Sequence, residues 1–102
     1  DDVADLDADT RAREAARTVA VPGRVPTDGV LLQDERRFGI PVTILSGGLD
    51  AESMRRMLSE WGAYAAEVDR IDELEVVTLG SGHWPQFSQP ERFAERLVAA
   101  VR

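Results

Sequence analysis

The chain has 102 residues, the size of one small domain, with 43% hydrophobic and 30% charged residues. This composition excludes collagen-like, disulfide-rich and wholly disordered classes of protein. The net charge is −7, and all 12 basic residues are arginine. Such an acidic chain lacks the basic stripe that neutralises phosphates, so we expect no binding to nucleic acid.

The chain contains no cysteine, which excludes a disulfide framework, a thiolate metal site and a cysteine nucleophile. A single histidine without cysteine cannot complete a tetrahedral zinc site, so we expect neither a metal nor another cofactor. No apolar run approaches the roughly 18 residues of a membrane span, and no signal-peptide pattern is present. We therefore expect a cytoplasmic protein that does not bind membranes.

The N-terminal region predicts one helix followed by a linker. Residues 1–21 favour a helix, with Asp9 and Thr10 as candidate caps, but alanines dominate its apolar face. A helix with so little apolar surface would not fold alone. Residues 22–29 (PGRVPTDG) hold two prolines and two glycines and predict a turn region, whereas residues 30–37 are ambiguous.

The region after residue 40 predicts alternating strands and helices. The β-branched run 40–45 (IPVTIL) is apolar on both sides, which is typical of a strand buried in a parallel sheet. Helical spacing follows over 50–61 and again over 63–74, before a second strand at 75–79 (EVVTL). The first of these helices presents one apolar stripe, formed by Met54, Met57, Leu58 and Trp61.

The C-terminus predicts a last helix opened by a capping box of Ser88 and Glu91, with Pro90 in its first turn. Its expected buried stripe consists of Phe93, Leu97, Val98 and Val101. The fold class is therefore α/β, a βαβα unit with two parallel strands near 41–46 and 75–79. Because two parallel strands alone do not make a viable sheet, we expect an incomplete domain.

Two residues with catalytic chemistry follow the two predicted strands. Asp50 comes after the pair Gly47-Gly48, and His83 comes after residues 80–82 (GSG). The carboxyl ends of parallel strands meet at one edge of a sheet, where ligands bind in open α/β folds. A carboxylate there can hold an imidazole in one tautomer and stabilise its charged form. The order Asp then His is that of a hydrolase triad.

Residues 40–50 resemble the seventh strand and the acid turn of the α/β-hydrolase family, and residues 81–90 (SGHWPQFSQP) resemble its histidine loop. The separation of 33 residues between Asp50 and His83 suits one crossover helix and one strand. The resemblance implies that Asp50 orients the base and that His83 is the general base and acid. It also implies that residues 1–25 are the end of a cap or lid helix and its linker, and that residues 26–102 are the C-terminal part of the core domain.

The family's nucleophile elbow, Gly-x-Ser-x-Gly, is absent from the sequence. Neither Ser46 nor Ser81 has a glycine two positions before it. We therefore expect no nucleophile in this chain, and no hydrolase activity from the chain by itself. Its expected partners are a small-molecule substrate and a separate N-terminal α/β-hydrolase segment, and an exposed sheet edge offers a route to a homo-oligomer.

Several alternatives stay open at this point. Glu52, two positions from Asp50, could serve as the acid, and Asp50 could simply cap a helix. Trp84 and Phe87 could line a substrate pocket or pack under the last helix. The function with the most support is hydrolysis of an ester, amide or related bond by a serine hydrolase, with the nucleophile outside the chain. The other functions are a non-catalytic pseudo-hydrolase or ligand-binding module, and an autonomous interaction domain.

Overall fold

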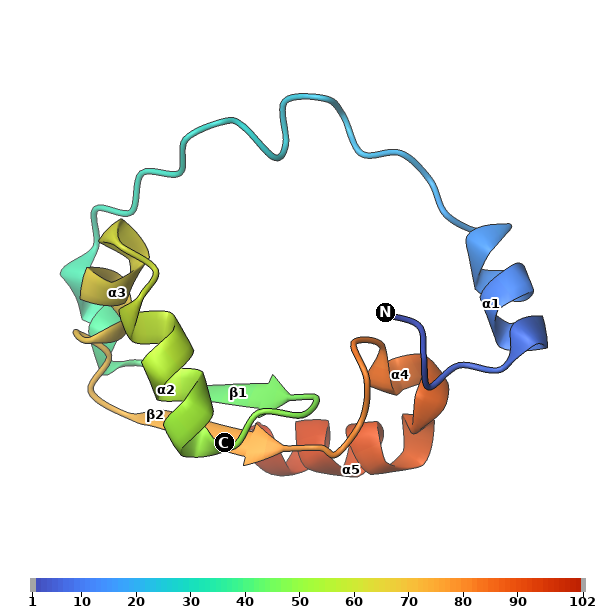
Figure 1. Cartoon of the computed structure of the whole chain (residues 1–102). Coiled ribbons are helices and arrows are strands. Elements are labelled where there is room, and N and C mark those ends of the chain that lie inside the picture. Colours follow the sequence, from blue (N-terminus) through green and yellow to red (C-terminus); the bar gives the residue numbers. More distant parts are fainter. Residues whose placement is uncertain (1, 102) are drawn as a thin grey trace.

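The computed structural model describes residues 2–101 as a mixed α/β structure with a small parallel sheet (Figure 1). None of the helices within these residues is long and apolar enough to cross a membrane. In chain order the elements are α1 (Ala8–Ala15), the 3₁₀ helix η1 (Glu35–Gly39), β1 (Val42–Ser46), α2 (Ala51–Ser59), α3 (Ala63–Val68), β2 (Leu74–Thr78), α4 (Pro85–Ser88) and α5 (Pro90–Ala100).

The sheet has two parallel strands, as the sequence predicted. Val42 lies opposite Leu74 and Ser46 lies opposite Thr78. The ladder extends one residue further, because the amide of Leu79 donates to the carbonyl of Ser46 at 2.7 Å. In Figure 1, α5 runs beneath the sheet and α2 crosses in front of β2. Parallel strands normally have more neighbours and cover on both faces, so this two-stranded arrangement is an incomplete portion of an α/β sheet.

The apolar core within the described residues is small. The radius of gyration is 16.1 Å, whereas a compact domain of this length would have about 13 Å. The stripe predicted over 50–61 is only partly buried. Met54 and Leu58 of α2 are buried, whereas Trp61 lies beyond the end of α2 and is 51% exposed. The buried apolar side chains are Leu6, Phe38, Met54, Leu58 and Leu79.

The N-terminal helix is much shorter than predicted. The prediction of a helix over 1–21 was wrong, because α1 spans only Ala8–Ala15. Its N-cap is Asp7, not Asp9 or Thr10, and the Asp7 carboxylate accepts a hydrogen bond from the Thr10 amide at 2.7 Å. The alanine-rich face buries too little area to extend the helix towards the proline and glycine that follow.

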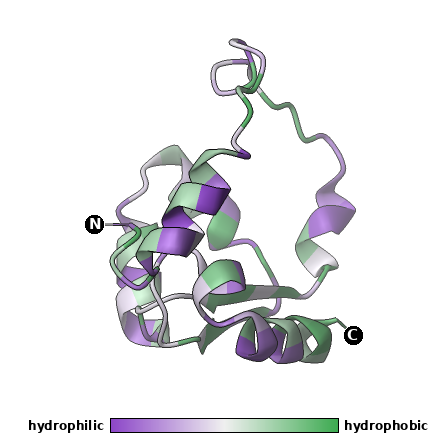
Figure 2. Cartoon of the chain, turned by 90° about the vertical axis from the view of Figure 1, so that its right-hand side faces the viewer, coloured by the Kyte–Doolittle hydropathy of each residue, from purple (hydrophilic) through white to green (hydrophobic). Residues whose placement is uncertain are grey.

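A long arch joins α1 to η1 and carries exposed apolar residues (Figures 1 and 2). Much of the arch is coloured green, for hydrophobic residues, in Figure 2. Val19 is 88% exposed and Leu31 is 87% exposed, so the arch buries little of its apolar surface against the described residues. Isolated apolar side chains on a surface are ordinary, but a continuous exposed run is typical of a surface that another element covers.

The last helix also differs from the prediction in two ways. The capping box does not form, because Ser88 ends the short helix α4 and Gln89 is the N-cap of α5. Residues 85–87, which the sequence placed in the histidine loop, form that helical turn together with Ser88. The predicted buried stripe of α5 is largely exposed, with Leu97 at 47%, Val98 at 73% and Val101 at 76%. The reason is that α5 packs on the sheet through β1 and leaves these side chains facing solvent.

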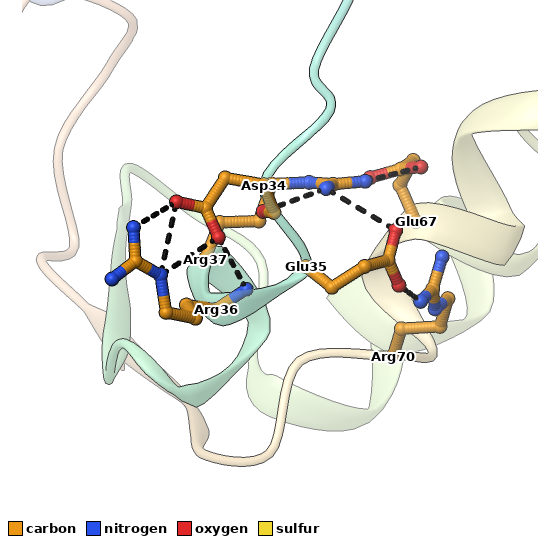
Figure 3. Close-up of polar contacts among 6 residues, drawn as sticks. All are labelled: Asp34, Glu35, Arg36, Arg37, Glu67 and Arg70. Atoms are coloured by element: carbon orange, nitrogen blue, oxygen red, sulfur yellow. Dashed lines mark hydrogen bonds and ion pairs between the residues drawn. The ribbon is translucent and has the colours of Figure 1, made fainter.

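A cluster of ion pairs fixes the chain just before β1 and consists of Asp34, Glu35, Arg36, Arg37, Glu67 and Arg70 (Figure 3). The Phe38 ring is buried, and the guanidinium groups of Arg37 and Arg70 lie 4.0 and 3.8 Å from its centroid. Arg37 also binds Glu67 of α3 at 3.0 Å, and Arg70 pairs with Glu35. Exposed ion pairs contribute little by themselves, so burial of the ring and the cation–π contacts, each about 0.5–1 kcal/mol, stabilise this junction.

The central core residue is Leu79, whose side chain is 1% exposed. We expect Leu79→Ala to lower the free energy of unfolding by about 2–5 kcal/mol, because it removes buried methyl groups and leaves a cavity. The matched control is Leu31→Ala, the same chemical change at a side chain that is 87% exposed. Urea unfolding followed by circular dichroism measures both.

If Leu79→Ala does not fold at all, Leu79→Val keeps the comparison measurable, with an expected loss of about 1 kcal/mol. Equal stabilities of the Leu79 and Leu31 variants would contradict the placement of Leu79 at the centre of the core.

Candidate functional site

Two turns meet at the carboxyl end of the sheet. The acid turn (residues 46–50) follows β1, and the histidine loop (residues 80–84) follows β2. The Ser81 amide donates to the Gly47 carbonyl at 2.8 Å, and the Thr78 hydroxyl donates to the Leu49 carbonyl at 2.9 Å. The structure therefore brings together the two segments that the sequence placed at one sheet edge.

Glycine is required at position 47 by the close approach of these turns. A Cβ atom there would lie 2.6 Å from the carbonyl oxygen of Gly82 and 2.9 Å from that of Ser81. Cβ atoms in proteins are essentially never found closer than 3.0 Å to such an atom. Both neighbours are backbone atoms, so they cannot rotate out of the way. A side chain at Gly47 would thus push the histidine loop away from the acid turn.

Ser46 holds the acid turn in shape. Its side chain is buried, and its hydroxyl oxygen accepts a hydrogen bond from the Leu49 amide at 3.0 Å. Sequence reasoning considered Ser46 only as a nucleophile and missed this role. The signal was its position at the strand end, one residue before two glycines, where serine commonly bonds to the backbone of a turn. This contact fixes the point at which α2 begins.

Asp50 is the N-cap of α2 and its side chain is exposed. Its carboxylate accepts a hydrogen bond from the Ser53 amide at 2.8 Å. The pKa of Asp50 is lowered, first by that amide and then by the Ser53 hydroxyl, with a smaller effect from the charge of Arg56. Glu52, the alternative acid, instead pairs with Arg56 at 2.8 Å on the surface of α2.

His83 is exposed in the histidine loop, where its ring lies edge-on to Trp84 with centroids 4.9 Å apart. Within residues 2–101 the imidazole and the Asp50 carboxylate share the sheet edge but are not hydrogen-bonded to each other. Asp50 bonds to its own helix, and His83 contacts its own loop. Catalytic hydrogen bonds are often absent or long before a substrate binds.

An open recess of about 740 Å³ lies beside His83. The acid turn, the start of α2 and the histidine loop form its walls, and its lining includes Leu49, Met54, Met57, Trp84 and the backbone of Gly82. A recess of this size is in the range that holds a small organic molecule.

A second recess, of about 540 Å³, lies between α1 and α4. It is lined by Leu6 and Ala15 from the N-terminal region and by Trp84 and Phe87. Trp84 and Phe87 are 39% and 37% exposed, so they are not packed beneath α5. Trp84 contributes to both recesses and separates the polar edge near His83 from this apolar space.

Asp5 is a further polar residue at the histidine loop that sequence reasoning missed. Its carboxylate accepts a hydrogen bond from the Gly82 amide at 2.6 Å. The pair is 77 residues apart in the chain, and nothing in the local sequence around Asp5 marks it.

One of three comparisons with known proteins found a match, and it identifies the family of the chain. The model of the Alpha/beta hydrolase family matches residues 1–96, which is nearly the whole chain. No curated protein and no solved structure matches the chain. Because the match includes both the acid turn and the histidine loop, the chain belongs to the alpha/beta hydrolase family.

Proposed function

We propose that this chain supplies the acid and the histidine of a serine hydrolase whose nucleophile lies on a separate N-terminal segment. The observation that carries the proposal is the hydrogen-bonded contact between the acid turn and the histidine loop at the carboxyl ends of two paired strands. That edge is where α/β folds bind ligands, and a recess lies beside it.

In this proposal a serine hydroxyl of the N-terminal segment attacks the carbonyl carbon of an ester, amide or related bond. His83 takes the serine proton as the new bond forms, and then gives it to the departing alcohol or amine. Asp50 accepts a hydrogen bond from the other ring nitrogen, which fixes the tautomer and stabilises the imidazolium. Water then releases the acyl group by the same two proton transfers.

The same proposal assigns residues 1–25 to the end of a cap and residues 26–102 to the core. The exposed apolar side of α5 and the presence of only two strands in the sheet support it, because a larger α/β core would bury that side and add neighbouring strands. A small organic molecule is the proposed substrate. Its scissile bond would lie in the recess beside His83, and its apolar part would reach past Trp84 to Phe87 in the second recess.

The experiment that tests this function is reconstitution of the esterase. The chain is assayed with a panel of p-nitrophenyl esters by itself and after joining to the upstream segment that carries the serine elbow. We expect no turnover above background from the chain alone and clear turnover from the joined protein. A joined protein that hydrolyses none of the esters or the matching amides would refute the proposed reaction.

The alternative function is a non-catalytic, ligand-binding protein of the same fold. The observation that favours it is that Asp50 bonds to Ser53 and not to His83. The residue at the elbow position of the upstream segment discriminates the two: glycine or alanine there supports binding, whereas serine supports catalysis. Calorimetric titration with ester analogues would then show binding without turnover.

A further inference from the structure

We propose that Asp5 is a positioning residue that holds the histidine loop in place for His83, an inference that rests on the proposed function. Asp5 lies before α1, far in sequence from the sheet, yet its Oδ2 accepts a hydrogen bond from the Gly82 amide at 2.6 Å. Gly82 is the residue immediately before His83, so this bond fixes the peptide that directs the imidazole.

The pKa of Asp5 is lowered, first by the nearby Ser88 side chain at the end of α4 and then by the hydrogen bond from the Gly82 amide. The carboxylate that accepts the Gly82 bond is therefore ionised at neutral pH. Hydrogen bonds to an ionised acceptor are stronger than neutral ones.

A side chain at position 82 would displace the Asp5 carboxylate. A Cβ atom there would lie 2.5 Å from Cγ of Asp5, and closer still to Oδ1, so the Asp5 side chain would have to move away from the loop. From the other side, the carbonyl oxygen of Gly82 faces the acid turn at Gly47. The peptide before His83 is thus held between the Asp5 carboxylate and the acid turn.

Asp5 is itself kept in position by its neighbours. Leu6, the next residue, is 7% exposed and its carbonyl accepts a hydrogen bond from the Arg11 side chain at 2.9 Å. The N-terminal region therefore anchors Asp5 while leaving its carboxylate directed at the histidine loop. In this way residues before α1 act on the placement of His83 without touching the reacting atoms.

The test uses the complete hydrolase with Asp5→Ala, Asp5→Asn and the control Asp9→Ala, an exposed acid in the first turn of α1. We expect Asp5→Ala to lower kcat about 10- to 100-fold with KM changed less than about twofold, because the base is misplaced while the recess is kept. Asp5→Asn retains an acceptor for the Gly82 amide and should recover most of the activity. Asp9→Ala should behave as the unchanged protein.

A second variant tests the same contact from the loop. Gly82→Ala should lower kcat by a similar factor, and the double variant Asp5→Ala/Gly82→Ala should lose less than the product of the two single losses. A kcat of Asp5→Ala within about twofold of the unchanged protein would overturn the proposal. So would a loss that Asp5→Asn does not recover.

A measurement that does not depend on turnover separates this inference from the proposed reaction. Hydrogen exchange of the Gly82 amide should be slow in the unchanged protein and fast in Asp5→Ala. If esters are not hydrolysed but Gly82 exchange responds to Asp5, the reaction fails and the positioning contact stands. If Gly82 exchange is the same in both proteins, the positioning contact fails whatever the reaction is.

Discussion

Replacing His83 by alanine in the complete hydrolase is expected to lower kcat by about 10⁴-fold or more. A serine hydroxyl is a weak nucleophile at neutral pH, and without the imidazole nothing removes its proton or protonates the leaving group. In serine hydrolases, loss of the histidine removes almost all of the triad's contribution and leaves only binding and oxyanion stabilisation. Steady-state hydrolysis of a p-nitrophenyl ester measures the change.

The control for His83→Ala is Glu91→Ala, an exposed acid in the first turn of α5. It should keep full activity. Both variants should melt close to the temperature of the unchanged protein, because both side chains are exposed and neither is part of the apolar core. Ester hydrolysis that survives His83→Ala would remove His83 from the catalytic role and with it the proposed mechanism.

Asp50→Asn is expected to lower kcat by about 10³- to 10⁴-fold while leaving the fold intact. Asparagine caps a helix about as well as aspartate, so the bond to the Ser53 amide can persist. The amide cannot stabilise the imidazolium, and it permits the wrong tautomer of the histidine. Kinetics and thermal unfolding of the same sample separate loss of charge from loss of structure.

Glu52→Gln is the matched control for Asp50→Asn, since the chemical change is alike and the residues are two positions apart. Glu52 pairs with Arg56 on the helix surface, and its replacement should leave kcat unchanged. The opposite pattern, with Glu52→Gln inactive and Asp50→Asn active, would transfer the acid role to Glu52. If both variants keep the full activity of the unchanged protein, the acid is neither Asp50 nor Glu52.

The pH dependence of stability gives a further check on Asp50. Its pKa in the folded chain lies below the ordinary value of 3.8, so the capping contact contributes stability above about pH 4. That contribution is lost as the pH falls through the folded pKa, because the unfolded carboxylate binds protons first. The side-chain amide introduced by Asp50→Asn does not titrate, so the stability difference between the two proteins should shift in favour of this variant as the pH falls below about 4.

The sequence by itself determined the order of the two strands and the main helices, and the sheet edge at which the candidate site lies. Two β-branched runs and the helical spacing between them predicted the parallel strands, because strand and helix periods are local properties of the chain. The glycines after each run predicted the turns that carry Asp50 and His83. Membership of the alpha/beta hydrolase family agrees with the resemblance seen in those two turns.

Only the tertiary structure decided the lengths and the contacts of these elements. The N-terminal helix ends at Ala15 and the side chains of Leu97 and Val98 are exposed, because helix length and burial depend on what packs against a face. The hydrogen bond between Asp5 and Gly82 joins residues 77 apart, and no local pattern encodes such a pairing. Propensity and periodicity act over a few residues, whereas a site is assembled by contacts between distant segments.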